Sequence, residues 1–189
     1  MENALTVLQP ERIKTPDAFD QFAKLGADIA VVVAYGRILP ESFLDAFPKG
    51  AVNVHFSLLP KYRGAAPVNW AIVNGEPVTG VTTMKMDAGL DTGDILLQRE
   101  AEIGDAENSI ELMGRLAILG AELLSETLSN FDKIIPVRQD HERATYAPIL
   151  KKEDGRFAWT QTSVEIARRV RGFQPFPGTY TDLRGKKLT

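Results

Sequence analysis

The chain has 189 residues, of which 44% are hydrophobic and 25% charged, and it contains no cysteine. This composition fits one globular domain with a substantial core, and it excludes a disordered tail, a disulfide scaffold and any thiolate nucleophile or metal ligand. The longest apolar run, residues 29–35, has seven residues, far below the ~20 that span a bilayer, which favours a soluble, cytoplasmic chain.

The net charge of −3 is unevenly distributed. Residues 151–189 contain nine Lys or Arg and four Asp or Glu, whereas the rest contains 13 basic and 21 acidic residues. A basic end on an acidic body can face phosphate groups, because Lys and Arg release counterions when they bind a polyanion. It can equally be a solvated helix face, and both interpretations stay open.

The first elements predict an α/β fold. Residues 17–25 have apolar side chains at helical spacing, with Asp17 as the expected cap and Gly26 as the stop. Residues 28–34 form a β-branched run typical of a strand buried on both faces in a parallel sheet. A short helix at 40–47, a strand at 51–56 and a helix at 68–73 follow.

The remaining elements continue this pattern. Strands are expected at 80–86 and 95–101, separated by the Asp- and Gly-rich loop 87–94. The longest helix, 109–128, has Asn108 as its cap. It also has an apolar stripe that we expect in the core, made of Ile110, Met113, Leu116, Ala117, Leu123, Leu124 and Leu128. Beyond an irregular stretch, the pattern indicates a basic helix at 164–171 and a hairpin at 178–188. The fold class is therefore α/β, with a mostly parallel sheet and flanking helices.

Asn53 and His55 lie two residues apart in the strand predicted at 51–56. Side chains at this spacing project to the same face, roughly 6.6 Å apart. Histidine serves as a general acid or base near neutral pH, and an amide can stabilise an oxyanion. A nearby aspartate would fix the imidazole tautomer, with Asp87, Asp91 and Asp94 as candidates.

A structural role is the competing interpretation, because a lone histidine near a strand end is more often a hydrogen-bonded structural residue. The only other histidine, His141, lies in the polar run 138–143, where we expect a surface position. Two histidines without cysteine disfavour a zinc site.

These residues resemble the folate-dependent formyltransferases. The pattern Asn53-x-His55-x-Ser57-Leu-Leu-Pro60-x-x-x-Gly64, followed by Asp87-x-Gly-x-Asp91-x-Gly93, looks like the signature of that family. The stretches 34–40, 61–67, 86–94 and 146–155 are similar to the members that formylate the α-amino group of methionine on initiator tRNA. The implied fold is a Rossmann-like catalytic core.

The resemblance implies a role for each residue. With 10-formyltetrahydrofolate as donor, initiator methionyl-tRNA as acceptor and no metal, His55 would take and return a proton and Asn53 would stabilise the oxyanion. Asp91, favoured over Asp87, would orient His55, while Asp87 would shape the loop and Asp94 would cap the next strand.

The same resemblance implies a folate pocket. Its residues would be Ser57, Leu58, Leu59 and Pro60 from the loop after the strand, with Arg37, Ile38 and Leu39 around the pterin ring. For Ile38 and Leu39, plain core packing is the alternative. Arg37 departs from family members that have an apolar residue there.

The resemblance covers only part of the family pattern. Residues 1–150 would be the second part of the catalytic core, and 151–189 a basic linker leading toward a C-terminal β-barrel. The strands and the basic loop that precede this part in the family are missing, which would leave a hydrophobic sheet edge exposed. We therefore expect the chain not to fold stably alone.

Three other functions share some of these features. A sugar-nucleotide formyltransferase has the same His-containing motif, and a glycinamide ribonucleotide formyltransferase has the same three polar residues. A non-catalytic folate- or tRNA-binding module, or an inactive fragment, is the alternative of a different class. Residues 89–94 and 151–155 favour the tRNA-directed enzyme.

Overall fold

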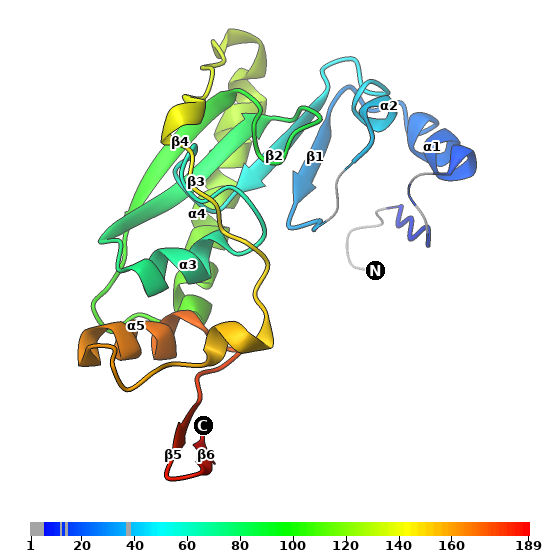
Figure 1. Ribbon diagram of the computed structural model, residues 1–189. Coiled ribbons are helices and arrows are strands. Elements are labelled where there is room, and N and C mark those ends of the chain that lie inside the picture. The colour runs from blue at the N-terminus through cyan, green and yellow to red at the C-terminus, as the bar shows by residue number, and fades with distance from the viewer. Residues whose placement is uncertain (1–5, 12, 14, 37–38) are drawn as a thin grey trace.

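The computed structural model describes residues 6–11, 13, 15–36 and 39–189. Its helices and strands follow one another in the order expected for an α/β chain (Figure 1). They are α1 (Pro16–Ala23), β1 (Ala30–Val33), α2 (Glu41–Leu44), β2 (Ala51–His55), α3 (Pro67–Asn74), β3 (Val78–Lys85), β4 (Ile95–Glu102), α4 (Ser109–Asn130), α5 (Ser163–Gly172), β5 (Thr181–Leu183) and β6 (Lys186–Leu188). Short 3-10 turns occupy Phe131–Lys133, His141–Arg143 and Lys152–Gly155.

The central sheet has the strand order β1-β2-β3-β4. β1 pairs with β2 in parallel, whereas β2–β3 and β3–β4 are antiparallel. The predicted α/β class is confirmed, but the mostly parallel arrangement does not hold for these four strands. For the β3–β4 pair the reason is local, because these strands are joined by a loop too short for the crossover that parallel neighbours need. The connection between β2 and β3 is long and contains α3, so loop length does not explain their antiparallel pairing.

The main core lies between this sheet, α3 and α4. Gly120 of α4 faces the sheet so closely that an added Cβ would lie 3.2 Å from Val54 and 3.6 Å from Val81. The absence of a side chain at this position therefore lets the helix approach the strands. The buried cluster consists of Val54, Val68, Ile72, Val81, Leu112, Leu116 and Leu123.

Helix α4 confirms the predicted cap and corrects the predicted stripe. The Asn108 side chain accepts hydrogen bonds from two backbone N–H groups of the first turn. Leu116 and Leu123 are buried as expected, but Ile110, Met113, Ala117 and Leu128 are exposed. The buried face contains Ser109, Leu112, Gly120 and Thr127 instead, because small residues allow the helix to lie close to the sheet.

Strand β1 corrects a second expectation, namely that it is buried on both faces. Val31 and Val33 are 41% and 47% exposed. The opposite face, with Val32, packs against a second cluster built from Leu39, Phe43, Leu44, Phe47 and Ala51. β1 is an outer strand of the sheet, so one apolar face and one backbone edge are uncovered by the described residues.

Helix α1 begins one residue before the predicted start. Thr15, not Asp17, is the cap, and its hydroxyl accepts a hydrogen bond from the Ala18 N–H. Pro16 occupies the first helical position, where its missing N–H costs nothing.

The C-terminal segment packs on the body through α5, and the β5–β6 hairpin extends away from it (Figure 1). Asn69 of α3 donates to the Gly172 carbonyl at 2.7 Å, and the Trp70 and Phe173 rings meet edge to face at 5.5 Å. Arg169 stacks over Phe173 and donates to the Asp154 and Arg156 carbonyls. The basic helix is thus partly structural rather than a wholly solvated face.

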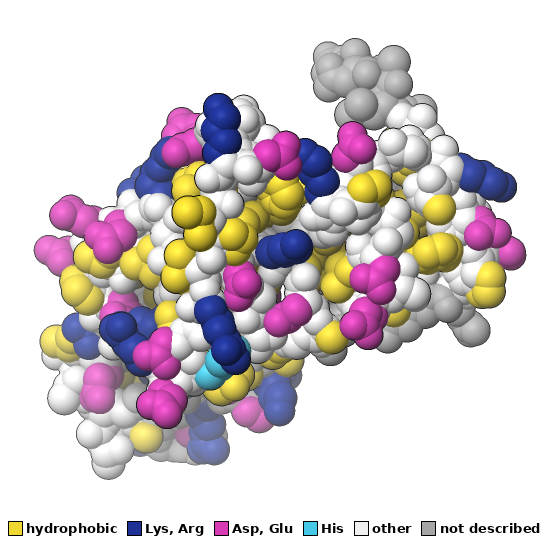
Figure 2. Space-filling model, turned by 90° about the horizontal axis from the view of Figure 1, so that it is seen from above, with side chains coloured by type: hydrophobic (Ala, Val, Ile, Leu, Met, Phe, Trp, Pro, Cys, Tyr) yellow, Lys and Arg dark blue, Asp and Glu magenta, His cyan; other side chains and the backbone are white. Residues whose placement is uncertain are grey.

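Charged side chains of both signs are interspersed over the face seen from above (Figure 2). In the part of the chain described here, no helix is both long and apolar enough to cross a membrane.

Candidate active site

Strand β2 positions two polar side chains on the face of the sheet away from α4. Val54 belongs to the core cluster under α4. Because side chains alternate along a strand, Asn53 and His55 project to the opposite face. His55 pairs with Thr82 of β3 and is only 6% exposed.

The loop between β3 and β4 brings Asp91 to these two side chains. The Asn53 Nδ2 donates to Asp91 Oδ1 at 3.5 Å, and the His55 Nδ1 lies 3.8 Å from Asp91 Oδ2. The Asp91 side chain is 14% exposed. Asn53, His55 and Asp91, which the sequence analysis singled out, therefore converge on one place.

A backbone carbonyl fixes the imidazole. The His55 Nε2 lies 2.9 Å from the Tyr62 carbonyl oxygen. Since a carbonyl can only accept, Nε2 must carry the hydrogen of this bond. Nδ1 is therefore the nitrogen that is free to exchange a proton, and it is the one that faces Asp91. Its 3.8 Å gap exceeds a hydrogen bond, as is common in catalytic pairs without substrate.

Burial lowers the pKa of His55 below its ordinary value of 6.5. The negative charge of Asp91 and the hydrogen bond to Tyr62 oppose this shift and raise the pKa. Burial wins, so the imidazole is neutral at neutral pH and its Nδ1 can accept a proton.

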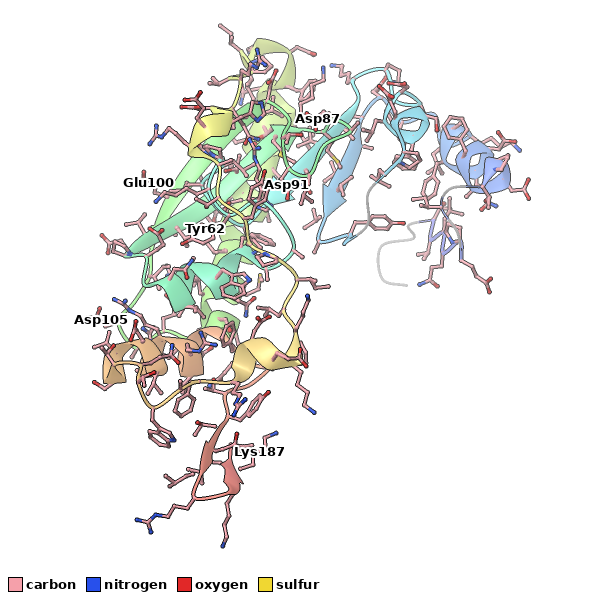
Figure 3. All side chains as sticks on the ribbon, viewed as in Figure 1. Tyr62, Asp87, Asp91, Glu100, Asp105 and Lys187 are labelled. Atoms are coloured by element: carbon pink, nitrogen blue, oxygen red, sulfur yellow. The ribbon has the colours of Figure 1, made fainter. Side chains whose placement is uncertain are left out.

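Of the three candidate aspartates, Asp91 lies beside His55. In the view of Figure 3, Asp91 lies between Asp87 and Tyr62. The Asp87 carboxylate accepts instead from the Gly89 N–H and the Thr92 hydroxyl of its own loop, at 3.0 and 2.7 Å. Asp94 is exposed, and its carbonyl accepts from the Lys85 N–H.

Two buried polar residues that the sequence analysis missed support the Asp91 loop. Gln139 is 3% exposed and donates to the Asp91 and Gly93 carbonyls. Arg63 is 2% exposed and donates to Gln139 Oε1. Gln139 lies in the run 138–143, which resembles a surface segment because its neighbours are charged. No local pattern reveals that one of its side chains points inward.

His141, expected at the surface, is exposed but also contacts this network. Its Nδ1 lies 3.2 Å from a terminal nitrogen of Arg63. His141 therefore adds a polar contact to an arginine that is otherwise buried.

The loop 57–62 is fixed to the sheet beneath it. The Ser57 hydroxyl is turned inward and donates to the Lys61 carbonyl. The Thr82 hydroxyl donates to the Ser57 carbonyl and accepts from the Leu59 N–H, while Gln98 donates to the Leu59 carbonyl. These bonds set the position of the Tyr62 carbonyl that holds His55.

Apart from Ser57, the residues predicted to bind folate fall into three groups. Leu58, Leu59 and Pro60 border a cavity of about 590 Å³ beside the loop, whose lining does not include His55 or Asp91. Leu39 is 5% exposed and packs in the second core cluster, which supports the core-packing alternative. Arg37 and Ile38 lie outside the described residues.

A cluster of three or more His, Cys, Asp or Glu side chains that could hold a metal ion is absent from the described ranges.

Two family models and closely similar known sequences match this chain. The family model described as formyl transferase matches residues 2–128, and the model of the formyl transferase C-terminal domain matches residues 149–189. The chain is 54% identical over 187 residues to a methionyl-tRNA formyltransferase of Solibacter usitatus. It is 51% identical over 189 residues to one of Geobacter sulfurreducens. The alignments cover 98% and 99% of the chain but 60% of each relative.

Solved structures with the same fold are more distant in sequence. HypX from Aquifex aeolicus in complex with tetrahydrofolic acid superposes with a TM-score of 0.76 at 22% identity, covering 92% of this chain and 30% of HypX. A sugar N-formyltransferase from a Shewanella species gives 0.77 at 21% identity, covering 93% and 73%. These likenesses support the Rossmann-like core.

The chain spans about 60% of the length of the curated relatives that it matches. The match at residues 2–128 extends over the whole central sheet and the Asn53, His55 and Asp91 cluster. The chain therefore belongs to the formyl transferase family.

Proposed function

We propose that the protein containing this chain transfers the formyl group of 10-formyltetrahydrofolate to the α-amino group of methionine on initiator tRNA. The observation that carries this proposal is the convergence of Asn53, His55 and Asp91, with His55 held so that Nδ1 is its exchanging nitrogen. The choice of acceptor is supported by relatives about 50% identical that are named methionyl-tRNA formyltransferase.

The first chemical step is attack by the amine. An α-amino group has an ordinary pKa of about 7.7–8.0, so a substantial fraction of it is neutral and nucleophilic near neutral pH. As the neutral amine attacks, its nitrogen loses one proton, which we assign to His55 Nδ1, kept neutral by burial. The amine nitrogen forms a bond to the formyl carbon, and the carbonyl electron pair moves onto oxygen. The Asn53 amide would donate to that oxygen.

The second step is collapse of the tetrahedral intermediate. The bond between the formyl carbon and N10 of the folate breaks, and the carbonyl re-forms on the methionine nitrogen. Protonated His55 returns its proton to N10, so the overall proton count is unchanged. Asp91 stabilises the imidazolium between the two steps, as its negative charge raises the pKa of His55.

The folate site is part of the same proposal. Ser57, Leu58, Leu59 and Pro60 would border it on one side, and Arg37 and Ile38 on the pterin side, with Leu39 packed in the second core cluster. Ser57 would act through the shape of its loop, since its hydroxyl is already bonded to the Lys61 carbonyl.

We also propose that residues 151–189 form the basic connection toward the tRNA-binding end, separate from the catalytic core at 1–150. The lysines of the β5–β6 hairpin, Lys186 and Lys187, are exposed and could approach phosphate groups, although the Lys187 ammonium also lies 4.2 Å from the centre of the Tyr180 ring. Because initiator tRNA is the acceptor, we place the reaction in the cytoplasm.

The test compares acceptors in one assay. The chain, and a version extended at both ends to the length of its relatives, are incubated with 10-formyltetrahydrofolate and either methionyl initiator tRNA or an aminosugar nucleotide. We expect formylation of the tRNA by the extended version. Formylation of the sugar alone would favour the sugar-directed alternative, and no transfer to either acceptor would overturn the proposal. The extended His55→Ala protein controls for contaminating activity.

A further inference from the structure

Gln139 joins three parts of the chain that are distant in sequence. Its Nε2 donates to the Asp91 carbonyl at 2.9 Å and to the Gly93 carbonyl at 2.7 Å. Its Oε1 accepts from the Arg63 guanidinium at 2.6 and 3.1 Å. Both Gln139 and Arg63 are almost completely buried, so these bonds are shielded from water and rigid.

Asp91 needs such support because its backbone is unfavourable. Its φ is +52°, in the left-handed region that side-chain-bearing residues rarely adopt. A residue in this conformation persists where its surroundings over-determine it. The two Gln139 bonds hold the backbone on either side of Thr92, and the Gly64 N–H holds the Asp91 carboxylate at 2.8 Å.

Arg63 couples the two supports. It is followed directly by Gly64, whose N–H contacts the carboxylate, while the Arg63 side chain contacts Gln139. The Arg63 backbone is itself fixed by bonds with Thr145 and Ala147. Asp91 is thus held at its carbonyl by Gln139 and at its carboxylate by the Gly64 N–H. Arg63 connects these two contacts, because it bonds Gln139 and directly precedes Gly64.

We propose that Gln139 is a positioning residue for the reaction, and that its two N–H donors hold the Asp91 carboxylate beside His55 Nδ1. The expected loss of kcat rests on the proposed function. The expected displacement of Asp91 from His55 rests on geometry alone. Gln139 touches neither His55 nor Asn53 in the bonds described above, so it acts through Asp91.

The diagnostic variant is Gln139→Glu in the extended protein. The carboxylate keeps the side-chain volume and still accepts from Arg63, but it cannot donate to the two carbonyls. Gln139→Met, which also removes the acceptor, is the second variant. The matched control is Asn69→Asp, which likewise removes amide donation to two carbonyls, those of Gly172 and Gln174, far from His55.

Two measurements separate positioning from general destabilisation. We expect Gln139→Glu to lower kcat by about 10- to 100-fold, as misplacement of a reacting group does, with KM for both substrates within about threefold. In Gln139→Met, which adds no negative charge, we also expect the NMR titration midpoint of His55 to fall, because Asp91 no longer lies close enough to raise it. Asn69→Asp should change neither quantity, although it too loses stability.

The outcomes distinguish this inference from the proposed function. An unchanged kcat in Gln139→Glu together with an unchanged His55 midpoint in Gln139→Met would overturn the positioning role. An equal loss of kcat in Asn69→Asp would also overturn it, since the effect would then be one of stability. If the unsubstituted protein transfers no formyl group, the proposed function fails, and the His55 midpoint still decides the role of Gln139. If Gln139→Glu does not fold, the midpoint in Gln139→Met decides in the same way.

Discussion

Two loops meet at His55, and they are anchored in different ways. The loop 57–62 rests on strands that lie directly beneath it, through Thr82 of β3 and Gln98 of β4. The loop 87–94 is held by Gln139, which is 48 residues from Asp91 along the chain. One side of the imidazole therefore depends on the sheet, and the other on a long-range contact.

Because the two loops are anchored differently, the two imidazole nitrogens have different roles. The sheet-anchored loop supplies the Tyr62 carbonyl, which fixes the Nε2 hydrogen. The remotely anchored loop supplies Asp91, which tunes the charge on the Nδ1 side. Orientation of the ring thus depends on contacts with the sheet, and electrostatic stabilisation on the contacts that Gln139 and Gly64 make with Asp91 and its loop.

Removing the residue at which both loops meet should have the largest effect. In the extended protein, His55→Ala should lower kcat for formyl transfer by about 10²–10⁴-fold, the usual contribution of a positioned general base. Folate affinity should stay within a few-fold, because His55 is buried behind the two loops. Kinetics and folate titration would check this, and unchanged turnover would contradict the role given to His55.

Breaking the connection between the loops at Gly64 should have the next largest effect. Its φ is +119°, and an added Cβ would lie 2.6 Å from the Ala147 carbonyl oxygen. We expect Gly64→Ala to lower the free energy of unfolding by roughly 2–4 kcal/mol, because backbone must shift. Urea denaturation measures this.

Gly178→Ala is the control for that experiment. Gly178 also has a positive φ, +72°, but nothing lies within 4 Å of an added Cβ. Gly178→Ala should lower the free energy of unfolding by about 1 kcal/mol, from the unfavourable backbone conformation alone. Equal costs at both positions would show that the contact with Ala147 is unimportant.

The sheet-anchored loop can be weakened through Thr82→Val. The hydroxyl serves Ser57, Leu59 and Gln98, and its loss leaves buried partners unsatisfied. We expect a loss of about 1–3 kcal/mol in the free energy of unfolding. Thr79→Val on the same strand is the control, because the Thr79 hydroxyl bonds no residue within the described ranges. A smaller loss for Thr82 than for Thr79 would contradict this anchoring.

The smallest effect concerns pH and the burial of His55. The pKa of His55 in the folded protein lies below its ordinary value of 6.5, which applies to the unfolded chain. At a pH between the folded and the unfolded pKa, the unfolded chain binds a proton that the folded chain does not. Stability should therefore fall as pH drops from 6.5 through the folded pKa, with a slope of at most about 1.4 kcal/mol per pH unit. Urea denaturation of the unsubstituted protein and His55→Gln over this range would check it, since the substitution removes that part of the slope. Identical slopes would contradict the burial effect.

The sequence predicted most elements closely because apolar periodicity and turn residues determine them locally. The strand expected at 51–56 is observed at Ala51–His55, and the helix expected at 109–128 at Ser109–Asn130. Strand pairing was predicted less well. The antiparallel pairing of β3 with its neighbours is decided by the path of the connections rather than by the residues of the strand.

In the candidate site too, the residues placed by local spacing were predicted and the supporting residues placed by distant contacts were not. Asn53 and His55 share a face because of their spacing, which the sequence displays. Arg63 and Gln139 were missed because burial of a polar side chain depends on partners far along the chain. An exposed sheet edge was predicted, and β1 is indeed an outer strand. Burial of both of its faces was wrongly expected, because β-branched runs look alike in outer and central strands.

The tautomer of His55 tests the central claim most directly. Imidazole ¹⁵N NMR of the extended protein, with the His55 signals assigned by their loss in His55→Gln, distinguishes a ring protonated at Nε2 from one protonated at Nδ1. At a pH above the His55 titration, we predict the neutral ring with hydrogen on Nε2, donated to the Tyr62 carbonyl. A neutral ring with hydrogen on Nδ1 would contradict the account, because Nδ1 could then not accept the proton of the attacking amine.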